Sequence, residues 1–193
     1  MIKNIQNKLN FINISKEEMT LYEWKPPQSF KSYILDMNIV KENTTKDIFF
    51  HLNKGNMKIV YIRIGSLLYT IGADQEVQFQ FLEALLEHID KKFHEIWDID
   101  VIFSYGNVSS TIFKDFTTQV NEIIENAEDL IKKVDVFCRV CKKTLLLYVK
   151  KSTIEKATSF PVPLVYNHRG HAVVTYIDQN FVVRGVELVN ITG

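Results

Sequence analysis

The segment from Lys58 to Gly72, KIVYIRIGSLLYTIG, constrains the fold more than any other part of the sequence. Its first half alternates with a period of two, its second half is rich in β-formers, and Gly65-Ser66 between them suits a turn. From Glu76 onward, apolar residues recur every four positions, which is the pattern of a helix. The segment therefore predicts an antiparallel strand pair that leads into a helix, a scaffold without a catalytic signature.

The helix that begins near Glu76 has a stripe wide enough to face a core. This stripe comprises Val77, Phe81, Leu82, Leu85, Leu86, Ile89 and Phe93. A second helical run over 108–131 is expected to bury Ile112, Phe116, Val120, Ile123, Ile124 and Ala127 on one side.

Four more elements are predicted upstream of Lys58. A hairpin joins strands over 8–14 and 19–24, a short helical stripe covers 30–37, and a further strand covers 48–52. The resulting order is two strands, a helix, three strands and two helices. This order predicts an α+β domain with a five-stranded antiparallel sheet flanked by helices, in a longin-type or profilin-like arrangement over residues 1–130.

The composition limits the class of protein. The chain has 193 residues, 46% of them hydrophobic, and its formal net charge is zero. A chain of this length can bury a core without disulfide bonds or metal ions. Its neutrality argues against binding nucleic acid chiefly through phosphate neutralisation. No run reaches the roughly 18 apolar residues of a bilayer span, and the N-terminal MIKNIQNKLNFINIS lacks the apolar core of a signal peptide. We expect a cytoplasmic protein that reaches membranes, if at all, through its partners.

Several motifs resemble the small chains of clathrin adaptor complexes, members of the longin superfamily. The resemblance covers about residues 8–128. It includes the end of the first hairpin at Trp24, the strand signature Lys58-Ile59-Val60-Tyr61 with Arg63 and Leu67-Leu68-Tyr69, Leu82-Glu83-Ala84 in the long helix, and the segment Asp98–Phe103 before the last helix. Ile62 departs from the family pattern, which prefers a basic residue there.

The resemblance implies a non-enzymatic protein-interaction module in membrane trafficking or its archaeal counterpart. Its partner would be a small GTPase, an adaptor or a tethering subunit, in a homo- or hetero-oligomer. The contact surface would include the third to fifth strands and the first hairpin. The predicted contacts are Thr20, Tyr61, Gly65, Leu67, Tyr69 and Ile89, with Thr20 replacing a basic residue that receives acidic dileucine signals in the family. Tyr61, Leu67 and Tyr69 also fit ordinary core or surface positions.

A compact β-rich module is predicted over residues 131–193, beyond the resemblance, with five short strands. Both cysteines lie in it, as Cys138-Arg139-Val140-Cys141, and His168 and His171 follow after 26 residues. This C-x2-C and H-x2-H set would complete a tetrahedral zinc site. The alternatives are two reduced, buried thiols or a redox pair, although the latter usually opens a helix in a thioredoxin-like unit.

Other functions remain open. A profilin-like or PAS-like ligand sensor would need an internal cavity. A zinc-knuckle nucleic-acid binder would use the lysines near the cysteines, but these are not interleaved with aromatic stacking platforms. An enzyme is not expected, because the sequence has no glycine-rich phosphate loop, no G-x-S-x-G and no H-E-x-x-H.

Overall fold

The computed structural model describes residues 5–27, 45–106, 108–168 and 171–189. It forms two compact units, Met1–Ala127 and Glu128–Gly193, whereas the sequence placed the boundary after residue 130. The helical stripe predicted over 30–37 lies outside the described residues. Among the helices of the described chain, none is both long and apolar enough to cross a bilayer.

The first unit contains a five-stranded antiparallel sheet with helices, so the α+β class is confirmed. The strands lie in the order β2-β1-β5-β4-β3, and β2 and β3 are the edges. A short 3-10 helix, η1, precedes the sheet. The bounds are η1 Ile5–Lys8, β1 Leu9–Lys16, β2 Met19–Trp24, β3 Phe50–Lys54, β4 Met57–Ile64 and β5 Leu67–Asp74.

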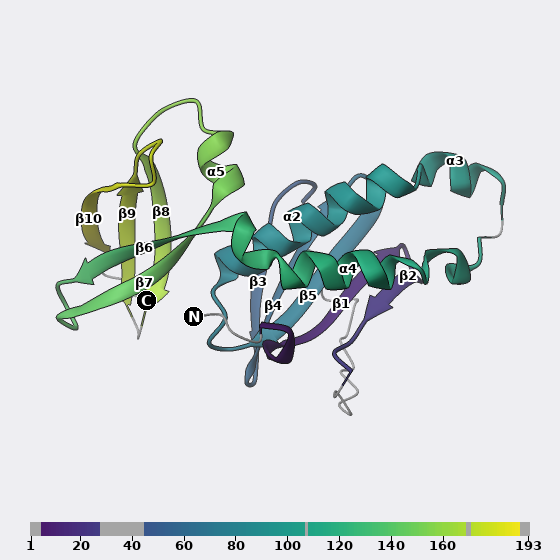
Figure 1. Cartoon of the computed structure of the whole chain (residues 1–193), viewed down its shortest axis with the longest axis horizontal. Coiled ribbons are helices and arrows are strands. Elements are labelled where there is room, and N and C mark those ends of the chain that lie inside the picture. The colour runs from purple at the N-terminus through teal and green to yellow at the C-terminus, as the bar shows by residue number, and fades with distance from the viewer. Residues whose placement is uncertain (1–4, 28–44, 107, 169–170, 190–193) are drawn as a thin grey trace. The chain divides into compact units, whose positions relative to one another are not determined.

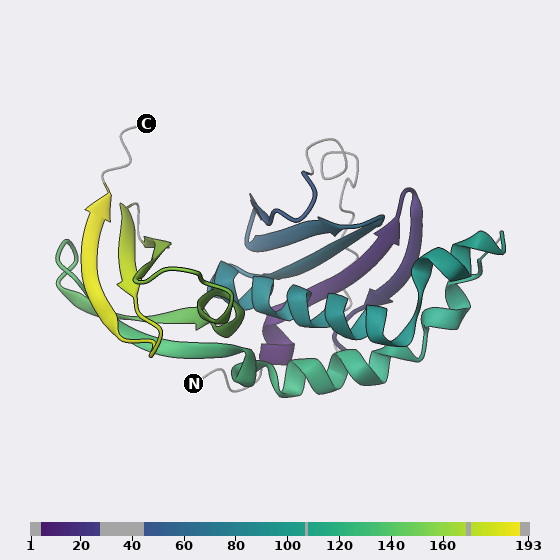
Figure 2. The same ribbon diagram turned by 90° about the horizontal axis from the view of Figure 1, so that it is seen from above.

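The helices follow the sheet in the sequence, and α2 and α4 pack against one of its faces (Figures 1 and 2). All seven residues of the predicted stripe are buried, and six of them lie in the long helix; the helix begins at Phe79 and not near Glu76, so Val77 belongs to the turn before it. The bounds are α2 Phe79–Ile96, α3 Ile99–Ser104, η2 Ser110–Phe113, α4 Phe116–Glu125 and η3 Ala127–Leu130.

The continuous helix predicted over 108–131 was wrong. The chain instead forms η2, α4 and η3, and α4 ends at Asn126, whose backbone N–H and side-chain amide both donate to the Glu122 carbonyl. Because η2 is a separate 3-10 turn before α4, Ile112 is 44% exposed and Phe113 takes the buried position. The other five residues of the predicted stripe are buried as expected.

Strand register gives the sheet two apolar faces. On the helix-covered face, Tyr22, Ile14, Tyr69 and Ile62 form one cross-strand row, with Tyr22 against Phe116 of α4. On the opposite face, Phe11, Met57, Ile59, Tyr61 and Leu68 form a buried cluster. Gly72 belongs to this second face, where the Phe11 ring lies so close that no Cβ fits.

An aromatic cluster centred on Phe93 joins the helices to the sheet. The Phe93 ring lies 4.8 Å from Trp97, 5.1 Å from Phe116, 5.4 Å from Phe113 and 6.4 Å from Tyr69, measured between ring centroids. Phe93, Phe113, Phe116 and Tyr69 are completely buried. One side chain of α2 therefore contacts β5, η2 and α4 together.

The second unit is built from two packed β-sheets. The hairpin β6–β7 and the antiparallel sheet β10-β9-β8 share one core, and β6 and β7 cross the other strands in Figure 1. β10 begins at Val183, after a turn in which Phe181 has a positive φ of 61°. The bounds are β6 Ile131–Cys138, β7 Lys143–Lys150, α5 Lys151–Glu155, β8 Val162–His168, β9 His171–Ile177 and β10 Val183–Val189.

Replacing the central aromatic residue is expected to destabilise the first unit. Phe93→Ala should lower its free energy of unfolding by about 3–5 kcal/mol, because the change removes a fully buried ring. Tyr105→Ala is the matched control, since Tyr105 is 85% exposed; its effect should stay within about 0.5 kcal/mol. Both tryptophans, Trp24 and Trp97, lie in the first unit, so denaturant unfolding followed by tryptophan fluorescence reports on this unit. Equal midpoints for the two variants would contradict the central role of Phe93.

Candidate partner-binding surface

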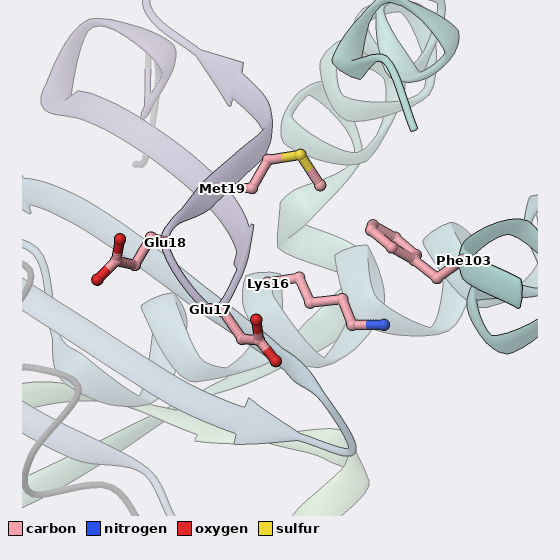
Figure 3. A pocket seen from close by; sticks show the side chains of 5 residues that line it. All are labelled: Lys16, Glu17, Glu18, Met19 and Phe103. Carbon is pink, nitrogen blue, oxygen red and sulfur yellow. The ribbon is translucent and has the colours of Figure 1, made fainter. Parts of the chain in front are cut away.

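A surface hollow lies between the tip of the β1–β2 hairpin and α3. It has a volume of about 470 Å³ and is lined by Lys16, Glu17, Glu18, Met19 and Phe103. Figure 3 shows the side chains of Lys16, Met19 and Phe103 directed toward one space, with the Glu18 carboxylate directed away from it. The hairpin turn is tight, since Glu17 has a φ of 52°. The hollow thus combines an apolar wall with both signs of charge.

One contact ties α3 to the hairpin. The Lys16 ammonium lies 3.8 Å from the centroid of the Phe103 ring, a cation–π geometry worth roughly 0.5–1 kcal/mol at an exposed site. α3 itself begins at Asp98, whose carboxylate accepts a hydrogen bond from the Val101 N–H at 3.1 Å. Asp98 is therefore a helix cap.

Exposed apolar side chains concentrate in the segment that carries α3, the helix whose Phe103 lines this hollow. Among the described residues of the first unit, five large hydrophobic side chains are exposed, and four of them belong to the segment that carries α3 and η2. These four are Ile96, Val101, Tyr105 and Ile112. Soluble proteins rarely gather exposed apolar groups in one region unless the region contacts a partner.

The two edges of the sheet differ in what covers them. At β3, His51 stacks on Phe79 with ring centroids 4.3 Å apart, and its Nε2 lies 2.8 Å from the Glu83 carboxylate, so α2 packs against this edge. At β2, contacts with η2 and α4 come from the helix-covered face. Thr20 and Glu23 of β2 are exposed.

The predicted contact residues divide into two groups. Thr20 and Gly65 are exposed, and Gly65 forms the β4–β5 turn with a φ of 58°. Tyr61, Leu67, Tyr69 and Ile89 are at most 7% exposed. Strand register explains the burial, since Leu67 and Tyr69 face the helices while Tyr61 belongs to the cluster on the other face. These four residues occupy core positions, which does not fit a role in direct partner contact.

A partly buried polar cluster lies where β5 meets α2, with Tyr69 buried, Asp90 half-buried and His94 exposed. Tyr69 Oη lies 3.4 Å from His94 Nδ1, and that nitrogen lies 3.0 Å from Asp90 Oδ1 without hydrogen-bond geometry. Burial raises the pKa of the Asp90 carboxyl, and Tyr69 and His94 oppose this only in part. Burial also raises the pKa of Tyr69 far above its ordinary value. The phenol therefore stays protonated and offers neither a base nor a nucleophile.

The predicted metal ligands lie in the second unit. Cys138 is fully buried, Cys141 is half-buried, and both thiols are free of disulfides. The side chains of His168 and His171 lie outside the part of the chain that the structure describes. Within the described part, no three His, Cys, Asp or Glu side chains gather as a metal site.

Comparison with known proteins adds no family assignment. Neither a scan against models of protein families nor a search of curated proteins gives a match.

The residues around the hollow carry little signal in the sequence. Lys16, Met19 and Phe103 come from separate elements, and neither spacing nor composition brings them together. The only usable indication was Asp98, because an acidic residue before an apolar run is typical of a helix start.

Charged substitutions separate core positions from surface positions. Tyr61→Lys and Leu67→Lys are expected to unfold the first unit, because each buries an unpaired charge at a cost of several kcal/mol. Thr20→Lys is the matched control on an exposed strand position and should leave the melting curve unchanged. Loss of native tryptophan fluorescence and far-UV circular dichroism measures the effect. Normal melting of Tyr61→Lys and Leu67→Lys would restore these residues as surface contacts.

The Asp90 cluster predicts a pH dependence of stability. Because the folded-state pKa of Asp90 is raised, its ionised form is disfavoured in the folded protein at neutral pH. Asp90→Asn should therefore be at least as stable as the wild type at pH 7. Its advantage should disappear as the pH falls below the ordinary Asp value of about 4. Urea midpoints at several pH values test this, with the exposed Asp100→Asn as control. A less stable Asp90→Asn at pH 7 would mean that pairing with His94 dominates.

Proposed function

We propose that this chain is a non-enzymatic protein-interaction module of the longin type. Its partner contacts the surface formed by the β1–β2 hairpin tip and α3. The observation that carries the proposal is the concentration of exposed apolar side chains, Val101, Tyr105 and Ile112, in the segment of α3 and η2. The α3 residue Phe103 also lines a surface hollow, together with Lys16 and Met19 of the hairpin.

The fold supports an interaction role. A sheet in the order β2-β1-β5-β4-β3, with helices on one face, leaves the hairpin tip and the β2 edge as places where a partner can bind. The surface also resembles interface composition in combining aromatic and methionine side chains with charges at the rim. The proposed partner class is a protein: a small GTPase, an adaptor or a tethering subunit, in membrane trafficking or its archaeal counterpart.

The proposal also holds that the chain has no catalytic activity. In the polar cluster of Tyr69, Asp90 and His94, the phenol of Tyr69 is protonated and fully buried, so a substrate has no access to it. The carboxyl of Asp90 is half-buried and its pKa is raised. Such a cluster is better explained as a partly buried hydrogen-bonding group of the scaffold.

A ligand-sensing function is the second candidate, and one observation favours it. Asn13 Oδ1, Ser15 Oγ and Thr70 Oγ1 are buried without a hydrogen-bond partner among the described residues. Asn13 and Thr70 are directly paired across β1 and β5. Buried oxygens of this kind usually find a partner, and a bound small molecule would supply one.

The proposal is tested by affinity capture with the full chain as bait. The lysate is supplied with GDP or with a non-hydrolysable GTP analogue. Nucleotide-dependent retention of a GTPase supports the GTPase-associated form, and retention of larger subunits in both conditions supports a constitutive complex. A small molecule that co-purifies with the chain, together with an empty capture, would favour the ligand sensor.

Surface variants locate the contact. Val101→Lys and Tyr105→Lys should each reduce retention of the captured partner at least about tenfold, because aromatic and apolar anchors dominate interface energies. Both residues are exposed, so the fold should persist. Val182→Lys is the matched control, since Val182 is 46% exposed and lies in the second unit. Full retention by the Val101 and Tyr105 variants would place the interface elsewhere.

A further inference from the structure

The end of the β6–β7 hairpin, residues 137–143, exposes apolar side chains. Strand pairing ends with Cys138 and Lys143, so residues 139–142 form the turn. The side chains of Phe137 and Val140 are each 55% exposed. In Figures 1 and 2 this turn extends past β8, β9 and β10, the other strands of the unit. We call residues 137–143 the β6–β7 tip.

Packing of the two cysteines holds the β6–β7 tip in one conformation. Cys138 is completely buried in the core of the second unit, and Cys141 packs against the same core. Lys142 takes a left-handed φ of 54°, which closes the turn. Because Cys138 and Cys141 are directed inward, Arg139 and Val140 between them are exposed to solvent. The exposed apolar groups are therefore presented by a packed turn.

Positive charge lies next to these apolar side chains. The hairpin from Ile131 to Lys150 contains six basic residues and one acidic residue, whereas the whole chain is neutral. Arg139, Lys142 and Lys143 are all exposed. Within the described part of the chain, none of these three cations takes part in an ion pair. The tip thus combines exposed apolar groups with unneutralised cations.

We propose that the β6–β7 tip binds directly to the surface of an anionic lipid bilayer. Phe137 and Val140 enter the interfacial region, while Arg139, Lys142 and Lys143 lie at the lipid phosphates. Burial of apolar groups and attraction of cations to anionic headgroups both strengthen such binding. The long stems of lysine and arginine keep their charges at the depth of the headgroups while neighbouring apolar side chains lie deeper.

A bilayer fits this tip better than a protein or a nucleic acid. A stable protein interface buries about 800 Å² on each partner, which a turn of four residues cannot supply by itself. A binder of single-stranded nucleic acid would interleave several aromatic side chains with its cations, but Phe137 is the only aromatic residue between Ile131 and Leu147. An exposed Val140 in the turn adds nothing to phosphate binding, whereas it adds apolar area in a bilayer.

Sedimentation of the full chain with vesicles tests the charge requirement. The chain should bind vesicles of phosphatidylcholine mixed with phosphatidylserine, and only weakly those of phosphatidylcholine alone. Replacing Arg139, Lys142 and Lys143 together by glutamine should weaken binding about 100-fold, since each cation near an anionic surface contributes roughly fivefold. The matched control removes three exposed cations that lie outside the tip, so that the net charge is the same, and should bind like the wild type. It carries Lys91→Gln, Lys114→Gln and Lys156→Gln.

A second experiment tests insertion of the apolar groups. Phe137→Ser and Val140→Ser should each weaken binding to the mixed vesicles at least about fivefold, because they remove apolar area. Val182→Ser is the matched control, since Val182 is exposed in the same unit. Val140→Trp should be quenched by lipids with brominated acyl chains, whereas the native Trp24 and Trp97 of the first unit should not be. Circular dichroism shows that each variant is folded.

Three results would overturn the proposal. The first is equal binding of both triple variants, which would reduce the effect to net charge. The second is an unquenched Val140→Trp variant that still sediments with vesicles. The third is a set of tip variants that sediment normally but lose a protein or an oligonucleotide bound by the wild type. The proposal rests on the second unit alone, so vesicle binding and partner capture by the first unit can fail separately.

Discussion

The aromatic cluster around Phe93 is the interaction on which the first unit depends. Trp97 and Phe113 both pack on the Phe93 ring, and they lie on either side of α3 in the sequence. The chain between them is therefore held at both ends by buried or half-buried rings, while its middle exposes Val101 and Tyr105. Because this exposed apolar segment is anchored at both ends, it loses less conformational entropy when a partner binds. The core thus positions the candidate surface.

The cluster also fixes how the sheet meets the helices. Tyr22 of β2 contacts Phe116, which in turn contacts Phe93. Trp24 adds a specific hydrogen bond, because its Nε1 donates to Asn121 Oδ1 of α4 at 2.9 Å. The hairpin whose tip lines the hollow is therefore joined to α4 at its base. A net gain of about 1 kcal/mol is typical for such a bond, but its geometry sets the orientation of α4 along β2.

The sequence predicts the elements of this fold better than it predicts the exposure of single residues. The four-residue repeat of α2 was sufficient to predict its buried residues, because a single apolar stripe of that helix faces the core. In β5 almost every residue is buried on both faces, so alternation does not tell inner from outer positions. Tyr61, Leu67 and Tyr69 were assigned to a surface through resemblance, and pattern alone had left their burial open. Ile112 was misplaced because a helical stripe carries no information about where the helix breaks.

In the second unit, the carboxylate of Asp178 stabilises the turn between β9 and β10. Asp178 accepts backbone hydrogen bonds from Asn180 and Val182, at 2.8 and 2.9 Å, and its other oxygen binds the Arg184 guanidinium. These contacts hold the pKa of Asp178 below its usual value, with the Val182 bond as the largest cause. This carboxylate thus fixes the β9–β10 turn, where Phe181 takes a left-handed conformation.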